Sequence, residues 1–289
     1  MNTVKLNTGA LMPIIGLGTF QIKGSELIHK ILDVALRAGY RSIDTAGGYR
    51  NEEDIGKSLK EMLPKYNLKR SDVFITSKLP PKFQGKSKSR ESCLQSLKDL
   101  QCDYLDLYLI HWPGTQGMKT DDPRNVELRK ESWLELEQLC KEGKLKAIGV
   151  SNYMIPHLEE LLKFCSIKPA LLQIEHHPYL NQKDIVSFCK EHDIAYQAYS
   201  SLGSHSDQNK LKDDPVILEL AKRHQKTPAQ ILLRWAVQQD IGVLPRSTNT
   251  VHVEENFNIF DFDLPEEDIT KINSLDQQLH YCWDPRTIV

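Results

Sequence analysis

The feature that most constrains the fold is a repeated alternation of short apolar runs with longer segments of helical period. Apolar runs of this length, without strict polar alternation, are typical of strands buried on both faces of a parallel sheet. Eight such runs separated by helices favour a closed (β/α)8 TIM barrel, with an open doubly wound sheet as the alternative, because alternation alone does not decide closure. The runs lie at 41–44, 73–78, 105–111, 147–151, 170–174, 195–199, 241–244 and 256–260.

The segments between the runs carry helix signals. Apolar residues recur at helical spacing from Leu27 to Leu36, and Gly39 stands where a helix C-cap glycine belongs. Thr227 and Pro228 form an N-cap and first turn of another helix. These signals predict helices packed between successive strands.

The N-terminal residues precede the first repeat. Residues 4–17 contain Asn7-Thr8-Gly9 between short apolar runs, which predicts a β-hairpin that plugs the N-terminal end of the barrel. Gly16 and Gly18 are expected in a turn ahead of the first barrel strand.

Length and composition limit the class of protein. The chain of 289 residues suits one barrel domain over 1–289, since such barrels take about 250 residues plus additions. A formal net charge of −2 argues against nucleic acid or an anionic membrane as a partner. No apolar stretch approaches the roughly 20 residues of a membrane span, and no secretory signal or C-x-x-C motif is evident. We therefore expect a cytoplasmic protein, and a monomer because no heptad pattern or apolar surface stripe stands out.

Ionisable and polar side chains follow successive strands of the predicted barrel. Any one of them has an ordinary structural explanation, such as an N-cap, a solvated strand end or a satisfied histidine. Together they favour a site, because barrel chemistry lies at the C-terminal ends of the strands and burying unpaired charge is costly. The residues are Asp44, Lys78, His111, Ser151, Asn152, Gln173 and Tyr199.

Short motifs at these positions resemble those of the aldo-keto reductase family, in order and over nearly the whole chain. They are most similar to the aldose reductase, prostaglandin F synthase and diketogluconate reductase branches, and not to the potassium-channel β subunits. The motifs are GLGTF (16–20), DTAGGYRNE (44–52), TSKL (76–79), LIHWP (109–113), IGVSNY (148–153), QIEHHPY (173–179) and LPRS (244–247).

The resemblance implies a catalytic tetrad of Asp44, Tyr49, Lys78 and His111. A carbonyl that accepts hydride becomes an alkoxide, so the site needs a proton donor beside the oxygen and positive charge behind that donor. Tyr49 would be the donor, and Lys78, held by Asp44, would lower the pKa of the phenol from its ordinary value of about 10. His111 would orient the carbonyl as a neutral imidazole.

No G-x-G-x-x-G follows a strand, so the Rossmann phosphate site is absent. The resemblance implies instead NADPH or NADP⁺ extended across the barrel rim. Its nicotinamide carboxamide would be bound by Ser151, Asn152 and Gln173 and its ring stacked on Tyr199. Other implied contacts are to the pyrophosphate (Ser200, Leu202, Ser204), the 2′-phosphate (Arg246, Ser247, Asn249) and the adenine (Glu255, Asn256). The complete set of implied cofactor contacts is Gly18, Thr19, Phe20, Asp44, Ser151, Asn152, Gln173, Tyr199, Ser200, Leu202, Ser204, Arg246, Ser247, Thr248, Asn249, His252, Glu255 and Asn256.

The cofactor preference depends on one departure from the family pattern. His252 stands where many members have an arginine over the adenine and 2′-phosphate, and a histidine is mostly neutral at pH 7 and lacks the bidentate fork. We therefore expect a preference for NADPH over NADH with a reduced margin.

The implied substrate pocket combines small and aromatic residues. They suggest an open, moderately apolar mouth for small aldehydes and ketones. The pocket residues are Phe20, Gly48, Tyr49, Pro80, His111 and Trp112.

Two alternative functions were weighed. A metal-dependent hydrolase is disfavoured and no metal is expected, because His176 and His177, as neighbours on a strand, point to opposite faces. A non-catalytic, structural or cofactor-binding member of the same fold stays open, since fold does not fix function.

Overall fold

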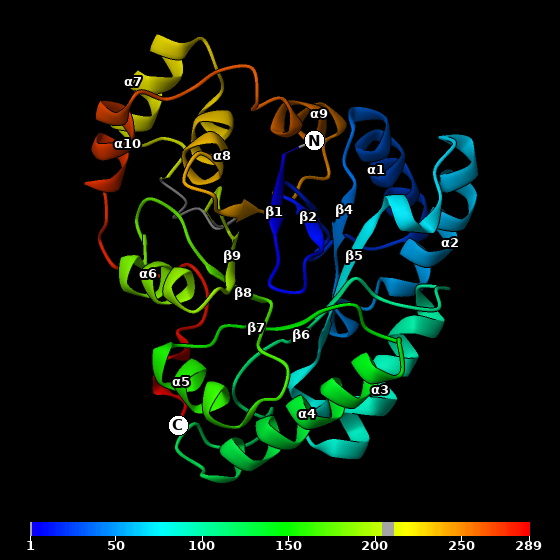
Figure 1. Ribbon diagram of the computed structural model, residues 1–289. Coiled ribbons are helices and arrows are strands. Elements are labelled where there is room, and N and C mark those ends of the chain that lie inside the picture. Colours follow the sequence, from blue (N-terminus) through cyan, green and yellow to red (C-terminus); the bar gives the residue numbers. More distant parts are fainter. Residues whose placement is uncertain (1, 204–210) are drawn as a thin grey trace.

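The computed structural model describes residues 2–203 and 211–289 of the chain (Figure 1). Within those residues, eight parallel strands form one sheet in the spatial order β10-β9-β8-β7-β6-β5-β4-β3. The strands are β3 (Leu17–Gly18), β4 (Ser42–Asp44), β5 (Phe74–Leu79), β6 (Leu107–Ile110), β7 (Ile148–Ser151), β8 (Leu171–Glu175), β9 (Ala195–Tyr199) and β10 (Gly242–Val243).

Backbone hydrogen bonds join the two edges of this sheet. The Gly16 amide donates to the Val243 carbonyl at 2.9 Å, and the Val243 amide donates to the Ile14 carbonyl at 2.8 Å. Residues Ile15 and Val243 form a parallel bridge. The sheet is therefore closed, and the predicted (β/α)8 barrel is confirmed over the open-sheet alternative.

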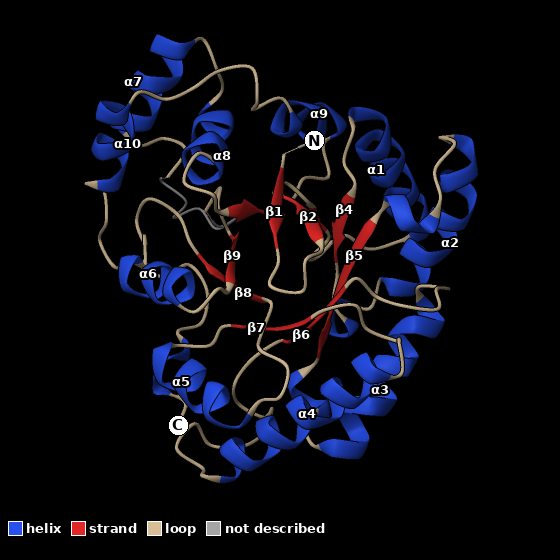
Figure 2. Cartoon of the chain, in the orientation of Figure 1, coloured by secondary structure: helices blue, strands red, loops and turns tan. Residues whose placement is uncertain are grey.

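Helices surround the barrel on its outside (Figure 2). They pack on strands whose residues are almost all buried, as expected for a parallel sheet covered on both faces. The helices are α1 (Ser25–Ala38), α2 (Glu52–Lys65), α3 (Lys86–Asp99), α4 (Arg124–Lys141), α5 (Ile155–Phe164), α6 (Lys183–Glu191), α7 (Pro215–His224), α8 (Pro228–Val237), α9 (Thr250–Phe257) and α10 (Glu266–Asn273).

The predicted helix boundaries at two sites are confirmed. Helix α1 ends at Gly39, whose φ of 111° places it in the left-handed region and whose amide donates to the carbonyls of Ala35 and Leu36. Helix α8 begins after Thr227, whose side chain accepts from the Gln230 amide in a capping box.

The N-terminal hairpin closes one end of the barrel. Strands β1 (Thr3–Lys5) and β2 (Leu11–Pro13) pair antiparallel, and Figure 1 shows them lying across the centre of the ring of strands. Leu6 and Met12 are buried against residues at the amino ends of the strands, including Phe74, Leu107 and Leu171. The predicted plug is confirmed, and it leaves the opposite rim for the site.

Two of the expected elements are wrong. Residues 16–18 are not a turn before the barrel, because Leu17 and Gly18 form its first strand, paired with Ile43 and Asp44. Gly16, Gly18 and Thr19 interrupt any apolar run around Leu17, so the sequence did not reveal this strand, whereas the equally short β10 (Gly242–Val243) lies within the predicted run at 241–244.

Residues 256–260 are not a strand. They contain the end of α9, which the Asn249 side chain caps by accepting from the Val251 amide at 2.9 Å. The ring of Phe257 lies 4.8 Å from that of Tyr40, so the apolar residues pack this helix against the end of α1. The barrel has its eight strands within the described residues because β3 takes the place of the segment at 256–260.

Among the helices of residues 2–203 and 211–289, none has the length and apolar character needed to cross a bilayer. The same residues contain no group of three or more His, Cys, Asp or Glu side chains arranged to hold a metal ion.

Candidate active site

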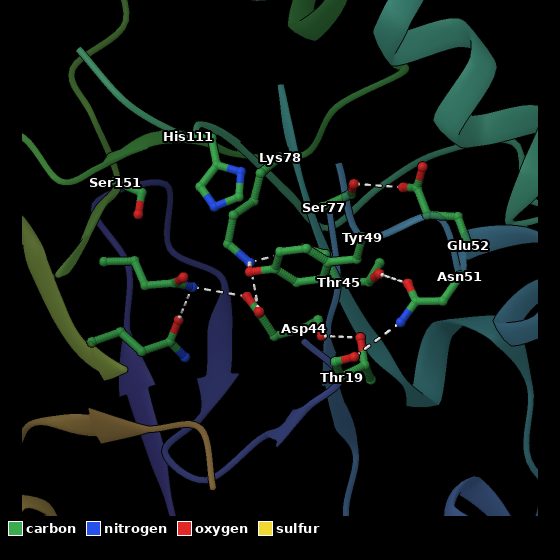
Figure 3. Close-up of polar contacts among 12 residues, drawn as sticks. Thr19, Asp44, Thr45, Tyr49, Asn51, Glu52, Ser77, Lys78, His111 and Ser151 are labelled. Carbon is green, nitrogen blue, oxygen red and sulfur yellow. Dashed lines mark hydrogen bonds and ion pairs between the residues drawn. The ribbon is translucent and has the colours of Figure 1, made fainter. Parts of the chain in front are cut away.

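The carboxyl ends of the parallel strands meet at one rim of the barrel. Asp44 ends β4, Lys78 lies one residue before the end of β5, and His111 follows β6 directly. Tyr49 reaches the same place from a 3₁₀ turn, Gly47–Tyr49, that follows β4. Figure 3 shows the side chains of Asp44, Tyr49 and His111 gathered around that of Lys78.

The Lys78 ammonium is completely buried and has an acceptor for each of its three N–H groups among the described residues. These acceptors are Asp44 Oδ1 at 2.5 Å, the Thr45 carbonyl at 2.9 Å and the Tyr49 hydroxyl at 3.3 Å (Figure 3). Burial lowers the pKa of Lys78, but the Asp44 and Tyr49 oxygens together outweigh it, so the net pKa is raised. The cation is therefore held charged inside the barrel.

The hydrogen bond between Lys78 and Tyr49 fixes which atom is the donor. An ammonium group has no acceptor lone pair, so the Tyr49 oxygen must accept. The hydroxyl hydrogen of Tyr49 is then free to point toward another acceptor. Tyr49 lines the open cleft described below, so that acceptor can be a bound molecule.

The net pKa shift of Tyr49 is opposite to the effect expected of Lys78. Burial raises the pKa of Tyr49 above its ordinary value of 10, although the Lys78 charge opposes the shift. The expected lowering effect of Lys78 is present, but the net pKa is raised, because the cost of burying a phenolate at the rim outweighs the attraction of one ammonium that Asp44 already neutralises. The group is a protonated donor at neutral pH.

His111 is the second polar group beside Tyr49. The two rings lie 5.7 Å apart between centroids, in an edge-on arrangement of 72°. Burial, together with the nearby Lys78 charge, lowers the pKa of His111 to about 3. Its Nδ1 has no hydrogen-bond partner among the described residues. The lowered pKa supports the expected neutral imidazole, whose Nδ1 is buried from solvent.

A buried network fixes the loop that carries Tyr49. The Asn51 amide nitrogen donates to the carbonyls of Thr19 at 2.9 Å and Ile22 at 3.1 Å, and Asn51 Oδ1 accepts from the Thr45 hydroxyl at 2.7 Å. The Thr19 hydroxyl donates to the Asp44 carbonyl at 2.8 Å (Figure 3). These bonds tie the loops after β3 and β4 together and hold Tyr49 over Lys78.

The amide groups expected to bind a carboxamide lie at the ends of the next strands. Gln173 Nε2 donates to Asp44 Oδ2 at 2.8 Å and to Gln197 Oε1 at 2.9 Å. Gln173 Oε1 accepts no hydrogen bond from any residue within the described part of the chain. Asn152 donates to the Ser151 hydroxyl oxygen at 3.2 Å and accepts from the Tyr199 hydroxyl at 2.6 Å. With respect to the described residues, the Gln173 carbonyl oxygen and the Ser151 O–H thus remain free at this side of Lys78.

Sequence reasoning missed Gln197, which holds Gln173 against Asp44. The available signal was a glutamine two positions before Tyr199, on the same face of a strand that is otherwise apolar or aromatic. A polar side chain that is only 1% exposed needs a buried partner, and Gln173 supplies it.

The residues expected to contact the phosphates lie at the start of α9, whereas Glu255 and Asn256, expected to contact the adenine, lie in its last turn. Arg246 is half-buried and forms no ion pair with any described residue, and Ser247 and Asn249 lie beside it at the helix N-terminus. Thr248 and His252 are exposed there. Glu255 is half-buried, whereas Asn256 is only 3% exposed and faces the protein interior. The start of α9 thus lies beside a cation, Arg246, whereas Asn256 presents little surface.

The segment after β9, which is expected to contact the pyrophosphate, is only partly described. Ser200 has a φ of 53° and its hydroxyl lies 3.5 Å from the Cys282 sulfur, and Leu202 is half-buried against the core. Ser204 lies outside the described residues.

At Gly18, a Cβ would lie 2.8 Å from the Leu244 carbonyl, so only glycine permits this approach of the two barrel edges.

All six residues that were expected to contact the substrate, Tyr49 among them, line one cleft. The cleft has a volume of about 490 Å³ and is walled by Phe20, Gly48, Pro80 and Trp112, with Tyr49 and His111 among its lining residues. The Phe20 ring lies 5.0 Å from that of Tyr49 and is 53% exposed at the mouth. The structure therefore brings the tetrad and the expected pocket together.

The histidines weighed as metal ligands lie in different surroundings. His177 Nε2 lies 3.0 Å from Glu175 Oε1, whereas the His176 ring stacks on Trp235 with centroids 5.1 Å apart. The two side chains therefore have different partners, although both residues follow the end of β8 and do not lie within a strand.

Comparison with known proteins decides the family. The model of the Aldo/keto reductase family matches residues 14–277. The chain belongs to this family.

Named relatives cover nearly the whole chain. This aldo/keto reductase is 42% identical to glyoxal reductase from Bacillus subtilis (strain 168), over 96% of this chain and 93% of that one. It is 40% identical to aldose reductase B from Dictyostelium discoideum, over 97% and 94% of the two chains.

Solved structures agree with these relatives. The aldo-keto reductase MGS-M4, from a Medee basin deep-sea metagenome library, superposes with a TM-score of 0.90 at 38% identity and 98% coverage of both chains. The aldose reductase from Schistosoma japonicum gives a TM-score of 0.87 at 38% identity, over 97% of this chain and 94% of that one.

Proposed function

We propose that this aldo/keto reductase reduces small aldehydes and ketones with hydride from NADPH and a proton from Tyr49, and catalyses the reverse oxidation of alcohols. The observation that carries the proposal is the buried Lys78 ammonium, 3.3 Å from the Tyr49 hydroxyl and 2.5 Å from Asp44 Oδ1, beside an open cleft. The names of the relatives, which include a glyoxal reductase and aldose reductases, point to carbonyl substrates.

The residues present suit a nicotinamide dinucleotide. A carboxamide has two N–H donors and one carbonyl acceptor, which match the unused Gln173 oxygen and the free Ser151 O–H. Tyr199, whose hydroxyl is held by Asn152, would present its ring to the nicotinamide. Arg246 would meet the 2′-phosphate, with Ser247 and Asn249 at the start of α9. When bound, the cofactor supplies the hydride.

In the proposed reaction, His111 and Tyr49 both contact the substrate carbonyl oxygen. His111 is uncharged because its pKa is lowered to about 3. It donates a hydrogen bond that orients the carbonyl, and it keeps its own proton. The Tyr49 hydroxyl passes its proton to the oxygen as negative charge develops there. Lys78 stabilises the phenolate that remains, and Asp44 keeps Lys78 charged and in place.

The experiment is NADPH oxidation with 4-nitrobenzaldehyde, for the wild type and for Tyr49→Phe. We expect turnover in the wild type and its loss in the variant, which keeps the ring and removes the proton. A wild type with no turnover, although it binds NADPH, would favour the non-catalytic alternative. NADH efficiency above NADPH efficiency would contradict the proposed role of Arg246.

The cytoplasmic location and monomeric state expected from the sequence stay predictions. Size-exclusion chromatography with light scattering tests the second of these.

A further inference from the structure

The mouth of the substrate cleft carries charge that carbonyl reduction itself does not use. Lys23, Arg50 and Lys82 line the same cleft as Tyr49 and His111, and all three are exposed. They come from the loops after β3, β4 and β5, so each of these three successive barrel strands contributes one cation. Their convergence follows from the pairing of β3 with β4 and of β4 with β5, which brings together residues that lie 27 and 32 positions apart in sequence.

These cations are not neutralised by the protein. None of the three forms an ion pair with any residue in 2–203 or 211–289, although the Lys82 ammonium lies 4.5 Å from the centre of the Phe83 ring. Some surface lysines do have partners, as Lys57 does with Glu53 at 2.6 Å, whereas others, such as Lys60, form no ion pair with a described residue.

No carboxylate faces the three cations across the cleft. Within the described part of the chain, neither Asp nor Glu lines this cleft. The nearby Asp44 carboxylate is already matched by Lys78. The positive mouth is therefore a local feature of a chain whose net charge is −2.

A cleft lined by one sign of charge concentrates the field at its mouth and raises the local concentration of ligands of opposite charge. The guanidinium fork of Arg50 also matches the geometry of a carboxylate or phosphate. Phe20, Pro80 and Trp112 add apolar walls to the same cleft.

We propose that the cleft mouth is an anion subsite, and that the preferred substrates are carbonyl compounds with a carboxylate or phosphate at the far end from the aldehyde or ketone. This inference rests on the proposed reductase function. The apolar walls further favour a hydrocarbon or aromatic spacer between the two groups.

The test compares substrates that differ in charge but little in shape. The first pair is 4-carboxybenzaldehyde and its neutral amide, 4-formylbenzamide, and the second is glyceraldehyde 3-phosphate and glyceraldehyde. For each pair the measured quantity is the ratio of kcat/KM for the anionic over the neutral member, with saturating NADPH. We expect the wild-type ratio for at least one pair to reach roughly 10 at low ionic strength, within the range of electrostatic steering. The two pairs distinguish a carboxylate from a phosphate.

Salt and charge variants then locate the effect. The ratio should fall toward about 1 when salt is raised from about 10 mM to about 1 M, because the screening length shortens from about 30 Å to about 3 Å. It should fall equally in the triple variant Lys23→Gln, Arg50→Gln, Lys82→Gln. A matched variant, Lys5→Gln, Lys30→Gln, Lys60→Gln, removes three exposed cations that do not line the cleft and should keep the wild-type ratio.

Three results would overturn the subsite. They are wild-type ratios of 1 or less for both pairs, equal ratios in the cleft triple variant and the wild type, and loss of preference in the matched variant as well. A rise in the KM for NADPH in the cleft variant, with the substrate ratio unchanged, would assign these cations to the cofactor and also overturn it. If 4-nitrobenzaldehyde and 4-formylbenzamide are both inert, the reductase function itself fails. If they are reduced and anions are not preferred, only the subsite fails.

Discussion

Replacing Lys78 with methionine tests the centre of the proposed site. The substitution keeps the length of the side chain and removes the charge. At 3.3 Å from the Tyr49 oxygen, an ammonium stabilises a full phenolate by about 5 kcal/mol if the effective dielectric constant is about 20. If half of that charge has developed in the transition state, the loss is about 2.5 kcal/mol. The expected fall in kcat/KM is then between about 70-fold and about 5,000-fold.

The same substitution should also destabilise the fold. Asp44 would keep its bond from Gln173 but lose its only cation among the described residues, and breaking a buried ion pair in this way costs about 3–5 kcal/mol. The double variant Asp44→Asn, Lys78→Met removes the stranded carboxylate. It should recover part of the thermal stability and none of the activity.

The assay is steady-state NADPH oxidation with 4-nitrobenzaldehyde, accompanied by thermal unfolding of each variant. Binding of NADPH, followed by protein fluorescence, checks that the rim is intact. A Lys78→Met enzyme within tenfold of the wild type would refute the assignment. Recovery of activity together with stability in the double variant would show that folding, and not proton transfer, had been lost.

Three further predictions concern other parts of the site. Burial raises the pKa of Glu52 to about 7 from 4.5, so its stabilising contribution is present below pH 4.5 and lost as the pH rises through 7. The stability of Glu52→Gln relative to wild type should therefore improve over that range by roughly 3 kcal/mol in chemical unfolding, and a pH-independent difference would contradict the shift. Because the pKa of His111 is lowered to about 3, kcat/KM should show no acid limb between pH 5 and 8, and a limb near 6.5 that disappears in His111→Gln would oppose this. Arg246→Gln should raise the KM for NADPH by about tenfold or more and that for NADH by much less, whereas equal effects would place Arg246 away from the 2′-phosphate.

The repeat of strands and helices predicted the barrel, but not all of its strands. The runs that contain β4 to β9 are long enough to show a fully buried pattern. Strand β3 has only two residues, Leu17 and Gly18. It is recognisable only because it pairs with β4 and because the preceding residue, Gly16, donates to the Val243 carbonyl. Conversely, residues 256–260 have strand-like composition, yet the Asn249 cap and packing against Tyr40 make the segment the end of a helix.

Within the site, sequence spacing identified the ionisable residues but not their proton equilibria. Lys78 and Asp44 could be chosen because unpaired charges are not buried at strand ends without reason. The net pKa shift of Tyr49 could not, because burial and the Lys78 charge act in opposite directions and only coordinates give their balance. Gln197 was also missed, since its partner Gln173 lies on the neighbouring strand.

The amino-acid sequence alone determined the fold class, the family resemblance and the identity of the four residues of the expected tetrad, because these depend on periodicity and on motifs local in the chain. The tertiary structure decided how the barrel closes, which oxygens accept from the Lys78 ammonium, and that Lys23, Arg50 and Lys82 share one cleft mouth. These features depend on distances between residues far apart in sequence, and such distances exist only once the strands have been arranged into a ring.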